Sequence, residues 1–361
     1  MFDGAMEEIH KRRKHYSGKY PKKFEEKYKE LNPDKYKDTV EHIIDKGSTP
    51  AGMHISICVD EILDFFDIKP GQNGLDCTFG YGGHTGRMLE KLEGKGHIVS
   101  LDVDPIESVK SEKRLRDKGF GEDIFSVELI NFSQIDKVAE TYGKFDFVLA
   151  DLGVSSMQID DPQRGFSYKI DGPLDLRMNP NKGMSAADLL KEIDRDDLVG
   201  ILIENSDEPY AEIIADRIID NRRKGIYMNT TTALRECICK ALDFLPSGSK
   251  SDIEEKNKIC KKTCQRVFQA LRIEVNHEFE ALYDLLEKLP GVLKENGKVA
   301  ILTFHSGEDR MVKKSFKSLY NDCIYSDYAK DVIRPSAEEC IRNPRAKSTK
   351  MRYAIRSGNP L

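Results

Sequence analysis

The segment FDFVLADLGVSSMQIDDPQRGFSYKIDGPLDLRM, residues 145–178, joins an apolar run to a long polar loop. Its first six residues, Phe145–Ala150, form a short apolar run of the kind found in buried strands of parallel sheets. From Asp151 to Met178 the chain has no helical or strand period and is rich in Gly, Pro, Asp, Ser and Arg. Open α/β sheets bind ligands at the carboxyl ends of their strands, so we expect the functional site in this loop.

Strands and helices alternate along much of the chain, which predicts a doubly wound α/β sheet. The predicted strands are Gly74–Phe79, His97–Leu101, Phe125–Ile130, Phe145–Ala150 and Gly297–Phe304. A predicted helix, Ser56–Phe66, precedes the first strand, and the helices Thr85–Leu92 and Ile106–Lys118 follow the first and second strands. Helical patterns without strands follow at Ala186–Glu192, Asp196–Glu204, Pro209–Asn221 and Thr231–Leu242, and Cys264–Leu286 reads as one strong helix. The sequence therefore predicts a sheet domain interrupted by a helical insertion.

The predicted division of the chain has four parts. Residues 1–50 form a basic N-terminal extension, residues 51–160 the first part of the sheet domain, residues 161–263 the helical insertion, and residues 264–361 the second part with a basic C-terminal segment.

Composition indicates a soluble protein, with 39% hydrophobic and 33% charged residues. The absence of a long apolar run and of a signal-peptide pattern leads us to expect a cytoplasmic protein without a membrane partner. The net charge is −5, yet residues 10–37 contain eleven Lys or Arg against four Asp or Glu, and the segment from Arg342 is also basic. Basic ends suggest a polyanionic partner, although solvated tails would have the same composition.

Eight cysteines are scattered along the chain, including the pairs Cys237/Cys239 and Cys260/Cys264. These spacings fit no usual zinc site, so we expect no metal. In a cytoplasmic protein we expect these cysteines to be reduced and mostly packed in the core.

A glycine-rich motif, DCTFGYGGHTG at residues 76–86, follows the first predicted strand and precedes a helix. Gly82 and its neighbour allow close approach of a ligand to the backbone. Asp102 ends the next strand, where a carboxylate can accept hydrogen bonds from both ribose hydroxyls of an adenosine. The third glycine of a dinucleotide fingerprint is replaced by Thr85. This pattern disfavours a nicotinamide dehydrogenase and favours S-adenosylmethionine, which has no phosphates to bind.

Asp151 stands at the end of the fourth strand, beside the expected cofactor site. An exocyclic amino group is a poor nucleophile, and an acceptor for its N–H bonds assists methyl transfer. Asp151 is a candidate for that acceptor, with a turn cap as the alternative. A C5-directed enzyme would need a Cys nucleophile, which residues 151–178 lack.

Further candidates lie in the same loop and after a later strand. Arg164 could bind a phosphate and Phe166 could stack on a flipped base, although core packing is the better interpretation for Phe166 alone. His305 follows the strand Gly297–Phe304 and could position substrate or carry a proton, although a His bound to backbone is equally ordinary there.

Five blocks together closely resemble the bacterial ribosomal RNA small subunit methyltransferase H family. They are DCTFGYGGHTG (76–86), residues 151–178, RVFQALRIEVNHE (266–278), TFHSGEDRMVK (303–313) and NPRAKSTKMR (343–352). The resemblance covers residues 53–356 and implies a Rossmann-like class I S-adenosylmethionine-dependent methyltransferase that methylates N4 of a decoding-centre cytosine in 16S rRNA. It implies cofactor contacts at Gly82, Gly83, His84, Asp102, Phe132, Asp151 and Gln158, and RNA contacts from the terminal basic block, for which Arg345 and Lys347 are our candidates.

The chain departs from the family pattern at Gly307, at residues 262–265 and at residues 206–210, and the last two positions concern the insertion or its exit. Two alternatives stay open. One is a methyltransferase for another amino group, adenine N6 or a protein side chain, and the other is a non-enzymatic RNA-binding factor of ribosome assembly. The sequence also leaves the oligomeric state open.

Overall fold

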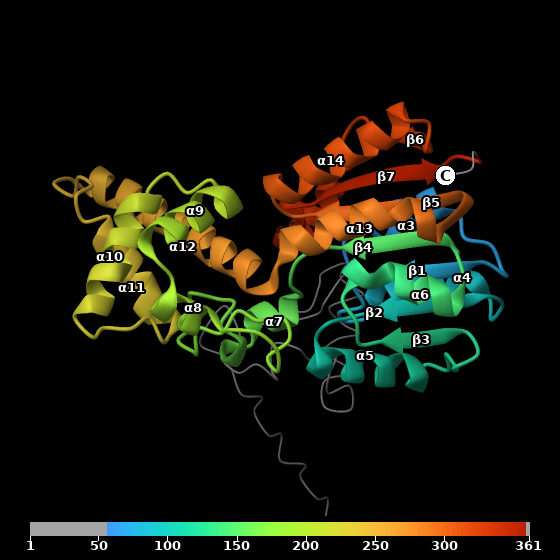
Figure 1. The fold of residues 1–361 in the computed structure, drawn as a ribbon, viewed down its shortest axis with the longest axis horizontal. Coiled ribbons are helices and arrows are strands. Elements are labelled where there is room, and N and C mark those ends of the chain that lie inside the picture. The colour runs from blue at the N-terminus through green and yellow to red at the C-terminus, as the bar shows by residue number, and fades with distance from the viewer. Residues whose placement is uncertain (1–55, 359–361) are drawn as a thin grey trace, which may run out of the picture. The chain divides into compact units, whose positions relative to one another are not determined.

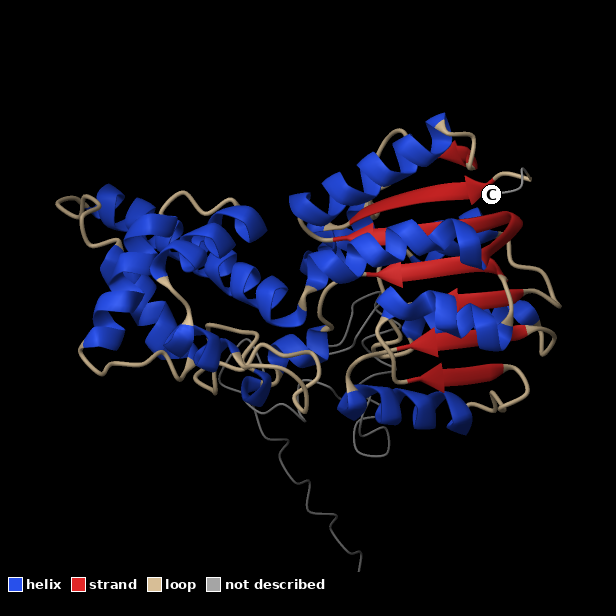
Figure 2. Ribbon diagram, viewed as in Figure 1, coloured by secondary structure: helices blue, strands red, loops and turns tan. Residues whose placement is uncertain are grey.

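The computed structural model describes residues 56–358, and the predicted extension 1–50 lies outside them. A seven-stranded sheet has the order β3-β2-β1-β4-β5-β7-β6, in which β7 alone runs opposite to the other six strands (Figures 1 and 2). The strands are β1 (Asn73–Asp76), β2 (His97–Leu101), β3 (Phe125–Glu128), β4 (Phe145–Asp151), β5 (Leu293–Thr303), β6 (Tyr325–Tyr328) and β7 (Lys350–Arg356). The strand order reverses between β1 and β4, where doubly wound sheets open a ligand crevice.

Helices cover both faces of the sheet, as a doubly wound fold requires. One face packs against α3 (Val59–Phe66), α4 (Gly83–Leu92) and Leu115 of α5 (Pro105–Asp117). The other face packs against α6 (Ile135–Tyr142), α13 (Glu278–Val292) and α14 (Ser306–Asn321), which lie in front of the sheet in Figure 1. The predicted α/β sheet is therefore confirmed.

Strands β1 and β4 approach closely at Gly74. A Cβ at this position would lie 2.1 Å from the Phe147 ring, so only glycine fits beside that aromatic side chain. β4 itself is buried along almost its whole length, which explains why its sequence reads as a continuous apolar run. This packing fixes the end of β4, and with it Asp151, next to the end of β1.

The segment between β4 and β5 contains a helical unit, at the left of Figure 1. Its helices are α8 (Ala186–Glu192), α9 (Arg195–Ser206), α10 (Ala211–Arg223), α11 (Thr231–Ala241) and α12 (Lys250–Asn276). They share a hydrophobic core of their own, formed by buried residues between Leu174 and Leu271. Short elements complete the chain: η2 (Phe132–Gln134), α7 (Ser156–Asp160), η3 (Pro162–Arg164), α15 (Ala337–Arg342) and η4 (Pro344–Ser348).

The single helix predicted over Cys264–Leu286 is wrong. The chain breaks at His277, which adopts a left-handed conformation (φ 51°) and separates α12 from α13. The apolar stripe through Val267, Leu271 and Phe279 keeps its spacing across the break, so periodicity alone cannot detect one left-handed residue. Helix α12 also starts at Lys250, so the predicted boundary between residues 263 and 264 falls inside it.

The cysteines differ from the expectation that they are reduced. Cys239 of α11 and Cys260 of α12 form a disulfide, and the Cys264 sulfur lies within 4.8 Å of both. Sequence spacing grouped these cysteines within each helix, whereas packing of α11 on α12 joins them between helices. The other six cysteines are free. Within residues 56–358, no helix is long and apolar enough to cross a membrane.

Candidate active site

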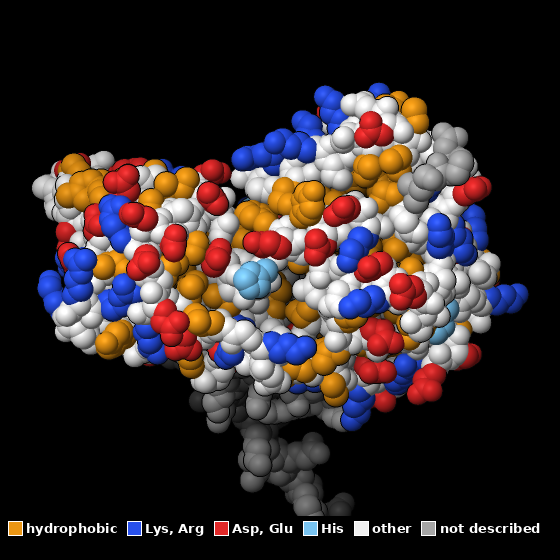
Figure 3. Space-filling model, viewed as in Figure 1, with side chains coloured by type: hydrophobic (Ala, Val, Ile, Leu, Met, Phe, Trp, Pro, Cys, Tyr) orange, Lys and Arg blue, Asp and Glu red, His pale blue; other side chains and the backbone are white. Residues whose placement is uncertain are grey.

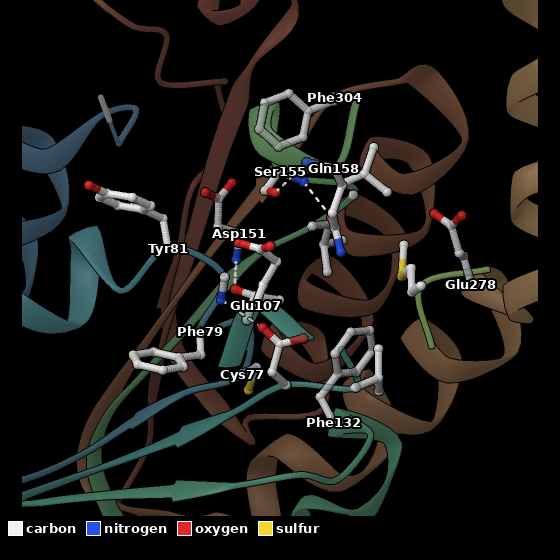
Figure 4. Close-up of a pocket in the computed structure, with 18 of the residues that line it drawn as sticks. Cys77, Phe79, Tyr81, Glu107, Phe132, Asp151, Ser155, Gln158, Glu278 and Phe304 are labelled. Carbon is white, nitrogen blue, oxygen red and sulfur yellow. Dashed lines mark hydrogen bonds between the residues drawn. The ribbon is translucent and has the colours of Figure 1, made fainter. Parts of the chain in front are cut away.

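A cavity of about 370 Å³ opens at the carboxyl ends of β1, β2 and β4 (Figure 4). Its walls come from the glycine-rich turn, the loops after β2, β3 and β4, the junction of α12 and α13, the start of α14 and the η4 segment. The predicted site residues that line it are Gly83, His84, Asp102, Phe132, Asp151, Gln158 and Arg345. The loop identified from the sequence therefore reaches the crevice that the strand order predicts.

The glycine-rich turn connects β1 to α4. Gly82 does not line the cavity; it is the N-cap of α4 in a left-handed conformation (φ 78°), which favours glycine. Asp76 fixes the turn, because its buried carboxylate accepts hydrogen bonds from Thr85 Oγ1 (2.6 Å) and from the Thr78 N–H (3.1 Å). Burial raises the pKa of Asp76. The turn thus presents backbone and the His84 ring to the cavity.

Asp102 follows β2 and faces the same cavity. Its Oδ2 accepts from the Gly80 N–H and its Oδ1 from the Asp104 N–H, both at 2.8 Å. Burial raises the pKa of Asp102 to about 6, although these backbone hydrogen bonds oppose the rise. A carboxylate has about four lone-pair sites, so each oxygen can still accept from a ligand hydroxyl.

Asp151 is the last residue of β4, and its N–H donates to Thr78 Oγ1 (2.7 Å). Its Oδ2 lies 3.6 Å from His84 Nδ1, and its Oδ1 is buried without a hydrogen-bond partner among residues 56–358. Burial raises the pKa of Asp151 to about 6; the carboxylates of Asp76 and Glu308 add to the rise and His84 opposes it. An incompletely paired carboxylate at a cavity wall can accept a hydrogen bond from a bound amine.

Phe132 and Gln158 lie on opposite sides of this cavity (Figure 4). Phe132 is half-buried at the start of η2 and packs against the core beneath α6 and α13. The Gln158 amide is already paired: its Oε1 accepts from the Ser155 N–H (2.8 Å) and its Nε2 donates to Asp104 Oδ2 (2.7 Å). Gln158 therefore shapes the wall as part of a capping box at α7.

The structure uses the Arg164 and Phe166 side chains inside the fold and not at the cavity, which for Phe166 is the core packing that the sequence favoured for this residue alone. The Arg164 guanidinium is buried, where it donates to Asp104 Oδ2 (2.7 Å) and to the Met178 carbonyl (2.7 Å). Phe166 packs against the core of the helical unit. Neither side chain lines the cavity. The contacts of Arg164 hold the loop in shape, because a buried cation requires its partners inside the protein. Phe166 attaches the same loop to the core of the helical unit.

His305 is also placed by a structural contact. It is the N-cap of α14: its Nδ1 accepts from the Glu308 N–H (3.5 Å), and its Nε2 lies 3.0 Å from Glu308 Oε1. The neighbours Phe304 and Glu308 line the cavity, whereas His305 does not. This arrangement corresponds to the second interpretation of a strand-end histidine, in which the ring serves the backbone.

Arg345 and Lys347 lie in η4, and both are exposed. Arg345 is at the cavity rim and its Nη2 lies 3.0 Å from Asp160 Oδ1 of α7. Lys347 is outside the cavity lining.

Sequence reasoning missed three polar residues from the end of α12 and the start of α13. Arg272 and Glu278 form an ion pair (2.7 Å) at the cavity wall. Asn276 accepts from the Met178 N–H (2.7 Å) and donates to the Leu176 carbonyl (2.8 Å), so it attaches the loop to α12. All three lie in the block 266–278, where the local pattern is an apolar helical stripe that carries no signal for these polar side chains.

Comparison with known proteins gives one consistent result. A family model described as the MraW methylase family matches residues 51–357. This chain belongs to the MraW methylase family. It is 66% identical to "Ribosomal RNA small subunit methyltransferase H 1" of Agathobacter rectalis, over 98% of this chain and 99% of the relative. It is 62% identical to the protein of the same name from Lachnoclostridium phytofermentans, over 98% of this chain and 94% of the relative.

Among solved structures, a putative rRNA-methylase from Clostridium thermocellum is similar with a TM-score of 0.39 and 12% identity, over 84% of this chain and 100% of that one. The family predicted from the sequence and the Rossmann-like methyltransferase fold are confirmed. The match to the MraW methylase model begins at residue 51, so residues 1–50 lie outside it.

Two groups of three side chains within residues 56–358 have the spacing of metal ligands in this MraW-family chain. They are Cys239, Cys260 and Cys264, and Cys58, Glu61 and Glu339. Neither group includes a residue that lines the cavity. The ionisable groups at the cavity wall include the carboxylates of Asp102 and Asp151 and the ring of His84.

Proposed function

We propose that this MraW-family protein transfers a methyl group from S-adenosylmethionine to N4 of a decoding-centre cytosine in the 16S rRNA of the small ribosomal subunit, in the cytoplasm. Its curated relatives are named ribosomal RNA small subunit methyltransferases. The observation that carries the proposal is the carboxylate of Asp151, which lines the cavity with one oxygen unpaired beside the glycine-rich turn.

The residues of the cavity fit the cofactor. The oxygens of Asp102 retain lone pairs for the two ribose hydroxyls, and the half-buried ring of Phe132 offers a surface for the adenine. Gly83, the His84 ring and Gln158 also line the cavity. When bound, S-adenosylmethionine supplies an electrophilic methyl group on a positively charged sulfur.

Asp151 can assist attack by the cytosine amino group, which is a poor nucleophile. The lone pair of the cytosine amino group is delocalised into the ring, so it attacks poorly unless an acceptor binds its N–H bonds. Asp151 is fixed at the end of β4 by its backbone hydrogen bond to Thr78, and its carboxylate can accept such a bond. Holding amine and methyl group in line provides the rest of the acceleration. The base must leave its stack to enter a cavity of this size.

Local cations at the cavity rim are proposed to hold the RNA. On the face shown in Figure 3, Lys and Arg side chains are interspersed with Asp and Glu side chains, so no single sign of charge covers it. Arg345 and Lys347 stand on η4, beside the loop after β4. We propose that they contact backbone phosphates next to the flipped base. Arg164 and Phe166 are not proposed to bind substrate, because their side chains are used inside the fold.

The test uses the full-length protein, radiolabelled S-adenosylmethionine and small ribosomal subunits that lack the modification, followed by digestion of the RNA to nucleosides. We expect the label in N4-methylcytidine. Asp151→Ala should lower the rate at least a hundredfold, whereas Asp117→Ala, at an exposed end of α5, should keep it. Label in another nucleoside or in protein would identify a different amino group as the substrate. Binding of subunits without any transfer would favour the assembly-factor alternative.

A further inference from the structure

The His84 ring has a defined tautomer. It lies in the first turn of α4, only 7% exposed, and its Nε2 is 2.9 Å from the Ile57 carbonyl oxygen. A carbonyl oxygen only accepts hydrogen bonds, so Nε2 must carry a proton whether the ring is neutral or charged. Nδ1 is therefore the only atom of His84 that gains or loses a proton.

Nδ1 points at Asp151. It lies 3.6 Å from Asp151 Oδ2. When His84 is neutral, the Nδ1 lone pair faces a carboxylate oxygen, and two acceptors repel each other. One proton placed between them removes this repulsion and converts the contact into a hydrogen-bonded ion pair. Separations of this length shorten in many active sites when the substrate binds.

The charged groups around the pair all carry the same sign. The charged side chains that act on His84 or Asp151 from neighbouring elements are Asp76 at the end of β1, Glu308 of α14 and Glu339 of α15. All three are carboxylates, so each stabilises an additional positive charge on the ring. The Asp76 carboxylate accepts from two hydroxyl or backbone donors and is fully buried, which leaves it unable to reach the substrate.

We propose that His84 and Asp151 form a proton-accepting pair, in which Asp151 binds the substrate amine and Nδ1 of His84 holds the proton that the amine loses. This inference rests on the proposed function and adds the destination of the proton. In the balanced step the C–S bond breaks with its electrons left on sulfur, and a C–N bond forms. The N–H bond of the amine then breaks, and an N–H bond forms at His84 Nδ1. Asp151 contacts the amine, and His84 receives the proton through the Asp151 carboxylate.

The first test needs neither cofactor nor RNA. The protein is labelled with ¹⁵N-histidine, and the ring nitrogen shifts are followed by NMR from pH 5 to pH 9. We expect Nε2 of His84 to carry a proton across this range, and the pH dependence of the Nδ1 shift to differ between the parent and Asp151→Asn. His97, whose ring nitrogens contact Ser126 and the Asp123 carbonyl, is the internal control. An unprotonated Nε2, or the same pH dependence of the Nδ1 shift in the parent and in Asp151→Asn, would contradict the proposed pair.

The second test uses His84→Gln, in which an amide can still donate to the Ile57 carbonyl but no Nδ1 remains. In single-turnover methylation of small subunits, we expect the rate at saturating cofactor to fall about 10²-fold or more and its dependence on pH to change. Cofactor affinity by titration should stay within about threefold, and His97→Gln should match the parent protein. Lower cofactor affinity with an unchanged rate at saturating cofactor would show that His84 only contacts the cofactor. If the parent transfers no methyl group to any RNA, the proposed function fails and the NMR experiment still decides the pair.

Discussion

Arg164 and Asp104 form a buried ion pair, with Nη1 and Oδ2 2.7 Å apart and side chains 8% and 0% exposed. The pair joins the loop after β4 to the N-cap of α5, because Asp104 Oδ1 also accepts from the Ile106 N–H. Gln158 donates to the same carboxylate. The Asp104 carboxylate therefore fixes both Gln158 in the cavity wall and Arg164 in the loop after β4.

Removing one partner of this pair should leave an uncompensated buried charge. We expect Arg164→Met and Asp104→Asn each to lower the free energy of unfolding by about 3–5 kcal/mol, and the double variant to lose less than the sum. Urea unfolding of the four proteins measures the coupling. Arg195→Met is the matched control, since the Arg195–Asp216 pair is exposed and its loss should change the free energy of unfolding little. Additive losses would contradict a direct pair.

Asp151 should make stability depend on pH in a definite direction. Its pKa rises from 3.8 in the unfolded chain to about 6 in the fold, so the folded state binds more protons between these values. The contribution of Asp151 therefore falls as pH rises through this window and stays low above it. We expect Asp151→Asn to be more stable than the parent at pH 8, by about 1–3 kcal/mol, and to lose this advantage near pH 4. Urea unfolding at both pH values is the measurement. An equal stability difference between Asp151→Asn and the parent at the two pH values would refute the raised pKa of Asp151.

The same pKa predicts the pH dependence of methyl transfer. The carboxylate accepts an N–H bond only when it is ionised, so kcat/KM should decrease as pH falls below about 6 and level off above it. Initial rates on small subunits from pH 5 to pH 9 provide the profile. A rate that rises towards pH 5 would show that the reactive form is the protonated one.

Asp102 should recognise the ribose of the cofactor. In Asp102→Asn, one oxygen becomes an N–H donor that faces the backbone N–H groups of Gly80 or Asp104, and charge-assisted bonds to the ribose are lost. We expect affinity for S-adenosylmethionine to fall at least tenfold. The parent should prefer the cofactor over its 2′-deoxyribose analogue, and the variant should discriminate less. Calorimetric titration of both ligands tests this, and unchanged discrimination would place the ribose elsewhere.

Lys347 should act through charge alone. We expect Lys347→Ala to weaken binding of small-subunit RNA and to lower the slope of log affinity against log salt by about 0.7–0.9 if it contacts one phosphate. Lys118→Ala is the control, because this exposed lysine follows α5 at the opposite edge of the sheet. Filter binding at several salt concentrations gives the slopes. Equal slopes for both variants would exclude η4 from the RNA contact.

Local patterns predicted the elements that build the cavity. The strand His97–Leu101 has the predicted bounds, and Asp102 and Asp151 stand at strand ends, because an apolar run followed by a polar turn is a short-range signal. The later strands β6 and β7 were missed. Strand β7 carries the basic residues Lys350, Arg352 and Arg356, and β6 is a four-residue edge strand, so neither has the apolar run that marks a buried parallel strand.

The sequence by itself determined the α/β sheet, the glycine-rich turn, the two strand-end carboxylates and the family, since each depends on residues that are neighbours in the chain. Only the tertiary structure decided what the charged side chains do. Arg164 is 60 residues from Asp104, and Asn276 is 98 residues from Met178. His84 likewise lies next to Asp151 only because the start of α4 and the end of β4 both pack against the glycine-rich turn. Partners of polar groups are set by long-range packing and burial, which no local pattern encodes.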